Sequence, residues 1–236
     1  MLEREFDQFA REYEGMLGQA VSTSGEDARF FASYKPADVH RHLLSAGSEV
    51  RGLRVLDFGC GVGLSLSYLG QEFPDADLYG ADISRKSLEF ANGADCASCL
   101  VQFHPELPLP FSDRQFDLIF VACVFHHIPQ PEHHRVLAEL HRITRPGGWL
   151  FLFEHNPLNP VTRHVVNTCA FDENAVLIRG TEMRRRIEGS GFARAVIRYR
   201  IFFPRLLRKL RCLELFLTWC PLGAQYYVAA RRDDDH

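Results

Sequence analysis

The nine residues Val55-Leu-Asp-Phe-Gly-Cys-Gly-Val-Gly63 decide the fold of this chain. A short apolar run ends in an acid, and a glycine then stands at every second position. The apolar run predicts a buried strand, and the glycines predict a sharp turn where a ligand can approach the backbone. The apolar residues from Leu64 to Leu69 predict a helix that begins at this turn. Because the first N–H groups of a helix lack partners within it, this corner predicts a nucleotide-binding site.

The spacing of the glycines separates this site from a dinucleotide site. A dinucleotide fingerprint has the spacing G-x-G-x-x-G, whose third glycine would fall at Leu64. A carboxylate at Asp57 would repel a pyrophosphate, whereas it suits a cationic amino group. The next apolar run ends in Asp82, where a doubly wound fold presents an acid to ribose hydroxyls. An amino group and a ribose without phosphate describe S-adenosylmethionine. Leu64 and Asp57 disfavour the alternative of an NAD-binding dehydrogenase.

Over roughly residues 50–155 the sequence resembles the class I S-adenosylmethionine-dependent methyltransferases. Besides the glycine turn, the resemblance rests on Leu109-Pro-Phe111, on Phe116-Asp-Leu-Ile119 and on His126-His-Ile128, which occur in the family's order. It implies an α/β fold, with a Rossmann-like, seven-stranded, mostly parallel sheet flanked by helices. We expect a helical cap over residues 1–45, a cofactor-binding domain over 46–236 and a helical insertion, or lid, over about 202–219 before the last strand.

The resemblance also implies the cofactor site. The residues that we expect at S-adenosylmethionine are Asp57, Gly59, Cys60, Gly61, Gly63, Asp82, Ile83, His104, Cys123 and Tyr13. His104 departs from the family, which often has an acid or an amide after the third strand to bond the adenine amino group. Glu106 or the backbone near His104 could replace that contact. Tyr13 belongs to a family-like opening, Phe6-Asp-x-x-Ala-x-x-Tyr13, and Tyr34 and Lys35 are either near the site or merely packed and solvated.

Four residues are candidates for a general base. His126 and His127 follow the predicted fourth strand, and Glu154 and His155 end the predicted fifth. Ligands bind at the carboxyl ends of the strands in open α/β sheets, so these side chains are expected beside the reacting methyl group. Histidine titrates near neutral pH, which suits proton abstraction. The preferred pairing sets His155, beside Glu154, opposite His126 or His127. Each histidine could instead be a structural hydrogen-bond donor.

The sequence predicts no bound metal. His126, His127, His133 and His134 are close together, and Cys96-Ala-Ser-Cys99 forms a Cys-x-x-Cys pair. A structural zinc site would need a second pair at matching spacing, and the sequence offers none. His133 and His134 are expected on the solvated side of the following helix.

Composition limits the partners and the compartment. A chain of 236 residues with 46% hydrophobic residues predicts one domain with additions. A net charge of −3 gives no general attraction to nucleic acid, and nothing marks a groove for a peptide. Seven cysteines, an odd number, predict reduced thiols and a cytoplasmic setting, and the N-terminus does not resemble a signal peptide.

The segment Phe202–Trp219 carries four cations and one acid within an apolar helical pattern. Such a segment could lie on a membrane surface, or it could be a lid helix that packs its apolar side on the domain. We therefore expect methyl transfer to an oxygen, nitrogen or carbon nucleophile of a small-molecule or lipid-linked acceptor, with peripheral membrane contact left open. The alternatives are a catalytically silent binding protein and a protein or nucleic-acid methyltransferase. The sequence leaves the oligomeric state open.

Overall fold

The computed structural model describes residues 26–93, 97–169, 172 and 174–233. Tyr13, the opening motif around it and Cys96 lie outside these residues. The described part of the predicted cap is helix α3 (Ala28–Ser45), whose first turn is capped by the Asp27 carboxylate accepting from the Phe30 N–H at 2.8 Å. Helix α3 runs through Pro36 without a break.

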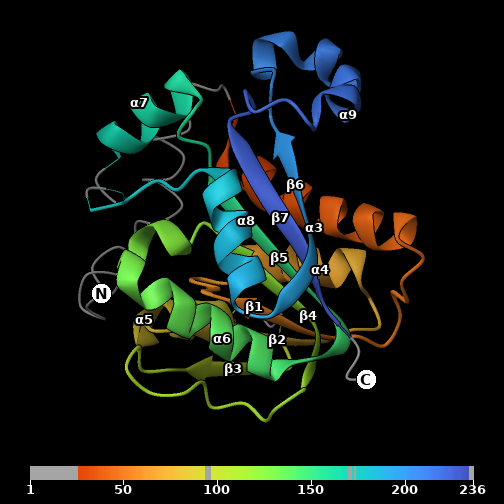
Figure 1. Ribbon diagram of the computed structural model, residues 1–236, viewed down its shortest axis with the longest axis vertical. Helices are drawn as coiled ribbons and strands as arrows, with labels where there is room; N and C mark the ends of the chain where they lie inside the picture. Colours follow the sequence, from red (N-terminus) through yellow and green to blue (C-terminus); the bar gives the residue numbers. More distant parts are fainter. Residues whose placement is uncertain (1–25, 94–96, 170–171, 173, 234–236) are drawn as a thin grey trace.

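A single seven-stranded sheet with the order β3-β2-β1-β4-β5-β7-β6 forms the centre of the molecule (Figure 1). Its strands are β1 (Arg54–Phe58), β2 (Asp77–Asp82), β3 (Cys99–Gln102), β4 (Phe116–Ala122), β5 (Thr144–His155), β6 (Phe192–Arg200) and β7 (Gln225–Arg232). The first five strands are parallel to one another, whereas β7 is antiparallel to both β5 and β6. This confirms the predicted Rossmann-like, mostly parallel sheet.

Helices cover both faces of the sheet. They are α4 (Leu64–Glu72), α5 (Arg85–Gly93), α6 (His133–Ile143), α7 (Pro160–Thr168) and α8 (Gly180–Gly189), besides α3. The apolar residues of α6 and α8 pack in one core and those of α3 and α4 in the other; α6 and α8 lie in front of the sheet in Figure 1. In β4, Ile119 and Val121 join the first core, while Leu118 and Phe120 join the second. A strand buried on both faces therefore reads as a continuous apolar run.

Residues Arg145–Gly148 form a bulge within β5. Thr144 pairs with Phe116 of β4, but the next pair joins Trp149 to Leu118. The intervening residues of β5 therefore loop out, and Gly147, at φ +74°, adopts a left-handed conformation within them.

The segment between β6 and β7 differs from the predicted lid helix. It consists of a 3₁₀ stretch, η5 (Arg205–Leu213), followed by a short helix, α9 (Glu214–Leu217). This segment and α7 project beyond the same end of the sheet (Figure 1). Its apolar side chains do not pack on the domain, since Leu206 is 92% exposed and Phe216 76% exposed. The expectation of a packed apolar side is therefore wrong. Among the residues that the structure describes, no helix has the length and apolar composition that a bilayer crossing requires.

Candidate functional site

The glycine turn after β1 has the backbone that its sequence predicts. Gly59, Gly61 and Gly63 have φ values of +76°, +52° and +81°, in the left-handed region that favours glycine. At Gly59 space is also decisive, because an added Cβ would lie 2.4 Å from a Val124 methyl carbon. The helix α4 begins directly after the turn, at Leu64. The turn thus leaves bare backbone at the carboxyl end of β1, where a ligand can approach it.

Asp82, at the carboxyl end of β2, joins two loops. One carboxylate oxygen accepts from the Gly61 N–H and the other from the Ser84 N–H, each at 2.8 Å. The Ser84 hydroxyl in turn caps α5 by accepting from the Ser87 N–H at 3.1 Å. Because a carboxylate has about four acceptor positions, Asp82 can hold this corner and still accept from a ligand. A role at the ribose stays a prediction.

Asp57 is 1% exposed, and its Oδ2 has no hydrogen-bond partner among the described residues. Burial, followed by repulsion from Asp82, raises the pKa of this carboxyl group to about 8, although Lys35 of α3 opposes the shift. A buried carboxylate without a partner is costly to keep ionised. A cationic ligand group placed beside it would remove that cost.

Two adjoining cavities lie at the carboxyl ends of the strands. The larger has a volume of about 1030 Å³ and is lined by Asp82, Ile83, Phe103 and His104 among others. The smaller, of about 170 Å³, is lined by Lys35, Asp57, Cys60 and His155 among others. The residues common to both are Gly59, Gly61, Val62, Ala122, Cys123 and His127. The two predicted acids therefore face different cavities, and an extended ligand that contacts both must cross the boundary between them.

Cys123 stands at this boundary, in a left-handed conformation with φ +58°. Burial alone would raise the pKa of its thiol, but Lys35 and His155 outweigh burial and lower it to about 7. The Lys35 ammonium lies 3.7 Å from the sulfur, and the Gln225 amide nitrogen lies 3.8 Å from it. The Tyr34 hydroxyl donates to the Gln225 side-chain oxygen. Tyr34 and Lys35, which the sequence placed here only as an alternative, both belong to the site.

Glu154 and His126 form a buried pair. The His126 Nδ1 lies 2.5 Å from one Glu154 oxygen, and the other oxygen accepts from the Phe125 N–H at 2.7 Å. Burial disfavours a charged His126, yet Glu154 and Asp172 together raise its pKa well above the usual value. Burial likewise disfavours a charged Glu154, but His126 lowers the pKa of Glu154. With both oxygens already engaged, Glu154 acts on the pocket through His126.

The other two histidines face the smaller cavity. Burial, followed by the positive charge on His126, lowers the pKa of His127 to about 3, so its ring is neutral. Burial also opposes a charge on His155, but the Cys123 thiolate raises the pKa of His155. The Gln225 amide nitrogen lies 3.3 Å from the His155 Nδ1. The structure thus brings the four predicted base candidates together.

Asp172 belongs to this cluster, although sequence reasoning gave it no role. Its Oδ1 lies 3.4 Å from the His126 Nε2 and 3.5 Å from the His127 Nε2. It lies in the connection after α7, far from both histidines in sequence. The short polar run that holds Asp172 and Asn174 could have marked this connection as a candidate site in the sequence. Nothing in the neighbouring residues, however, links Asp172 to His126.

His133 was expected to be solvated, and this expectation is wrong. It is 1% exposed, and its Nε2 lies 2.9 Å from the Ile128 carbonyl oxygen while its Nδ1 lies 2.7 Å from an Arg186 nitrogen. It therefore holds the loop that carries His126 and His127 against α8. A histidine with both ring nitrogens engaged in this way has a structural role.

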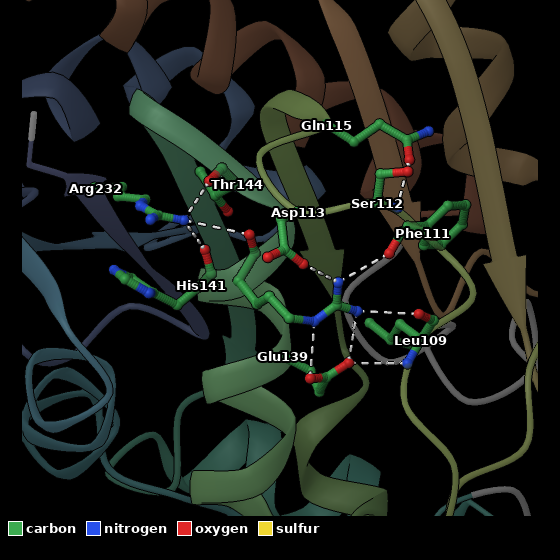
Figure 2. Close-up of polar contacts among 10 residues, drawn as sticks. Leu109, Phe111, Ser112, Asp113, Gln115, Glu139, His141, Thr144 and Arg232 are labelled. Atoms are coloured by element: carbon green, nitrogen blue, oxygen red, sulfur yellow. Dashed lines mark hydrogen bonds and ion pairs between the residues drawn. The ribbon is translucent and has the colours of Figure 1, made fainter. Parts of the chain in front are cut away.

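An arginine clamp fixes one wall of the larger cavity (Figure 2). The Arg142 guanidinium contacts both oxygens of Glu139 and donates to Asp113 at 2.7 Å. It also donates to the carbonyl oxygens of Leu109 and Phe111, at 3.0 and 2.9 Å. Figure 2 shows these partners converging from the loop before β4 and from α6. The clamp therefore ties the predicted Leu-Pro-Phe block to α6.

Residues 56–152 match a protein-family model that is described as a methyltransferase domain. The chain carries a class I S-adenosylmethionine-dependent methyltransferase domain. The match begins within β1 and ends within β5, so it includes the glycine turn, Asp82, Cys123 and both histidines after β4.

Individual relatives agree with the family match over part of their length. Phthiotriol/phenolphthiotriol dimycocerosates methyltransferase 1 of Mycobacterium ulcerans is 28% identical over 150 residues, 60% of this chain and 55% of that protein. Fatty-acid O-methyltransferase of Mycolicibacterium smegmatis is 31% identical over 117 residues, 49% of this chain and 42% of that protein. The chain thus spans about half the length of the curated relatives it matches.

A solved structure resembles the chain over nearly its whole length. It is a methyltransferase from Thermotoga maritima, described as a possible histamine N-methyltransferase, with a TM-score of 0.70 over 98% of this chain and 99% of that one. At 18% identity this likeness bears on the fold alone.

Proposed function

We propose that this protein transfers the methyl group of S-adenosylmethionine to a nucleophile on a small-molecule or lipid-like acceptor. The observation that carries the proposal is the buried Asp57 carboxylate, whose Oδ2 lacks a hydrogen-bond partner among the described residues and which lines the smaller cavity. The α-ammonium group of the cofactor would be the positively charged partner that the Oδ2 of this carboxylate lacks. No phosphate could replace it there, because a second negative charge would increase the repulsion.

The cofactor would span both cavities. Its adenosine occupies the larger one, with the ribose at Asp82 and the adenine near Phe103 and His104, and its methionine end enters the smaller one beside Asp57. Lys35, which is 6% exposed, supplies a cation for the methionine carboxylate. The sulfonium then lies at the boundary, beside Cys123. The role of the protein is to align donor and acceptor in a dry site, because the cofactor carries the reactivity.

The acceptor would reach the methyl group from the histidine side of the smaller cavity. We assign proton removal to His155, since the contact between His126 and Glu154 keeps His126 protonated and burial makes His127 a weak base. The acceptor hydroxyl or amine loses its proton to His155, its electron pair bonds to the methyl carbon, and the carbon–sulfur pair returns to sulfur as S-adenosylhomocysteine. A positioned base contributes about 10²–10⁴-fold to such a step.

A lipid-like acceptor is supported by the exposed segment before β7, which projects beyond the same end of the sheet as α7, a helix that lines the smaller cavity (Figure 1). The segment from Arg205 to Leu222 exposes Leu206, Leu207, Leu210, Leu213, Leu215, Phe216, Trp219 and Leu222. Four cations, at positions 205, 208, 209 and 211, stand among them. Apolar anchors among cations suit an anionic membrane surface. We therefore propose peripheral membrane contact through this segment. The described cysteines are all free, which supports a cytoplasmic setting.

Calorimetry with S-adenosylmethionine tests the cofactor assignment. Wild-type protein should bind it, and Asp57→Asn should weaken binding at least about tenfold, since a charged hydrogen bond contributes about 1.5–3 kcal/mol. The matched control is Asp75→Asn, an exposed acid outside the site, which should bind like wild type. Absence of binding to the wild-type protein would refute the proposal.

Catalysis is tested with a methyl-labelled cofactor and an extract of metabolites and lipids, read by mass spectrometry. Labelled product from the wild-type protein, and about 10²-fold less from His155→Ala with cofactor binding retained, is the expected result. Full turnover by both His155→Ala and His127→Ala would refute the base assignment. Tight cofactor binding without any labelled product would instead favour the silent binding protein.

A further inference from the structure

His126, His127 and Asp172 present three ligand atoms to one point. The Asp172 Oδ1 lies 3.4 and 3.5 Å from the Nε2 atoms of the two histidines, and all three atoms lie within 4.8 Å of one another. Metal–ligand bonds of about 2.1 Å at tetrahedral or octahedral angles place neighbouring ligand atoms roughly 3.0–3.4 Å apart. Two ligand atoms on opposite sides of an octahedral ion lie about 4.2 Å apart, so atoms 4.8 Å apart would draw together by about 0.6 Å there, and by about 1.4 Å as neighbours at a tetrahedral ion.

The surroundings of this point are those of a metal site. Glu154 fixes the His126 ring by accepting at Nδ1, which leaves Nε2 directed at Asp172, and Glu154 is itself held by the Phe125 N–H. A carboxylate on the far nitrogen of a ligating histidine orients it and raises its basicity. His126 and Glu154 are each 2% exposed or less, so neither is positioned by solvent. Two histidines that happened to lie close together on the surface would have no such buried carboxylate to hold one ring in place.

We infer that His126, His127 and Asp172 bind a divalent first-row transition metal ion, with Glu154 as the group that orients His126. The ion would replace the proton on the His126 Nε2, while the Nδ1 proton stays with Glu154. Two imidazoles and one carboxylate favour Zn²⁺ and its neighbours over Mg²⁺ or Ca²⁺, which prefer all-oxygen sites. The expectation of no metal came from residues that are close in sequence, and it did not include Asp172.

The position of the ion would determine which kind of acceptor atom is methylated. This part of the inference rests on the proposed function. Three protein ligands leave coordination positions open, and all three residues line the smaller cavity. His127 also lines the larger one, so the ion faces the boundary where the sulfonium would lie. A hydroxyl bound to the ion has a lowered pKa and loses its proton to His155 more readily. The geometry therefore favours an alcohol or phenol oxygen as the methylated atom.

Metal binding is measured on the tag-free full chain after treatment with a chelator. We expect Zn²⁺ to bind the wild-type protein at one ion per chain, and Co²⁺ to give visible absorption typical of a protein-bound ion. Asp172→Asn and His127→Gln should each lower the affinity by at least 100-fold, and Glu154→Gln by about 10–100-fold. The controls are Asp75→Asn and His164→Gln, an exposed acid and a histidine of α7 outside the cluster, which should match wild type.

The wild-type titration decides the matter even if a ligand variant does not fold. Wild-type protein that takes up no stoichiometric Zn²⁺ or Co²⁺ overturns the inference, and so do folded ligand variants that bind as tightly as the controls. Failure of the proposed function is a separate result, because it would appear as absent cofactor binding in calorimetry while metal binding persists. Methyl transfer that proceeds unchanged in the chelated protein would overturn the catalytic step.

Discussion

Replacing Asp57 by asparagine should make the free protein more stable while lowering its affinity for the cofactor at least about tenfold. The pKa of Asp57 is raised to about 8, against 3.8 for an ordinary aspartate. Each unit of difference corresponds to 1.36 kcal/mol. At pH 7, about three units above the ordinary value, Asp57 must take up a proton on folding, and this lowers the free energy of unfolding by about 4 kcal/mol. An asparagine amide avoids this cost, but its unmatched polar atoms cost about 1–3 kcal/mol.

The dependence on pH separates the charge from the amide. A group whose pKa is raised by folding contributes its full stability below the unfolded pKa, and this stability is lost as the pH rises through the folded pKa. For Asp57 the loss extends from about pH 4 to about pH 8. Between pH 5 and pH 7 the wild-type protein should therefore lose about 2.7 kcal/mol relative to Asp57→Asn, whatever the amide costs.

Thermal unfolding without cofactor at pH 5, 6 and 7 measures this difference. For a chain of this size 1 kcal/mol corresponds to about 2–4 °C in Tm. The Tm of Asp57→Asn relative to wild type should rise by about 5–10 °C from pH 5 to pH 7. At pH 7, S-adenosylmethionine should stabilise the wild-type protein and not the variant. A difference in Tm that stays constant across this range would refute the conclusion that burial raises the pKa of Asp57.

Three further outcomes follow from particular contacts. Gly59→Ala should lower the free energy of unfolding by more than about 1–2 kcal/mol and abolish cofactor binding, because the added Cβ would collide with Val124. Calorimetry and thermal unfolding should show a milder effect for Gly61→Ala, because Gly61 has the same left-handed backbone but nothing within 4 Å of an added Cβ. Alkylation of Cys123 by iodoacetamide should have its midpoint near pH 7, and Lys35→Met should move this midpoint upward, whereas the exposed Cys212 should react alike in both proteins when peptides are weighed by mass spectrometry. Arg142→Met should cost about 2–3 kcal/mol in chemical unfolding and weaken cofactor binding by loosening the wall of the larger cavity, whereas the exposed pair broken by Arg184→Met should cost less than about 1 kcal/mol. Equal effects of these two arginine substitutions on unfolding would contradict the conclusion that the Arg142 contacts hold this wall in place.

The parts of the fold that the sequence predicts are those with a local cause. The glycine turn follows from backbone conformation within a few residues, and β4 follows from an apolar run buried on both faces. Asp82 was predicted at the end of β2, because the carboxyl ends of parallel strands share one edge. The Ser84 cap has a similarly local cause, since its hydroxyl needs only the first turn of α5.

The parts that sequence reasoning missed depend on contacts across the fold. Asp172 meets His126 only because the connection after α7 returns to the end of β4. His133 is buried because α8 packs against the start of α6, and no pattern within α6 indicates that. The segment Arg205–Leu217 has an amphipathic pattern, but a pattern does not say what covers the apolar side. In the described residues nothing does, which is why the packed-lid expectation failed.

The position of β7 between β5 and β6 has a consequence for synthesis on the ribosome. His155 ends β5, and its pairing partner Gln225 is translated 70 residues later. At about 5–20 residues per second the nascent chain therefore displays the unsatisfied edge of β5 for roughly 4–14 seconds. Until the insertion of β7 closes this edge, Gln225 cannot reach His155 and Cys123, so the smaller cavity is completed only after β7 has been translated.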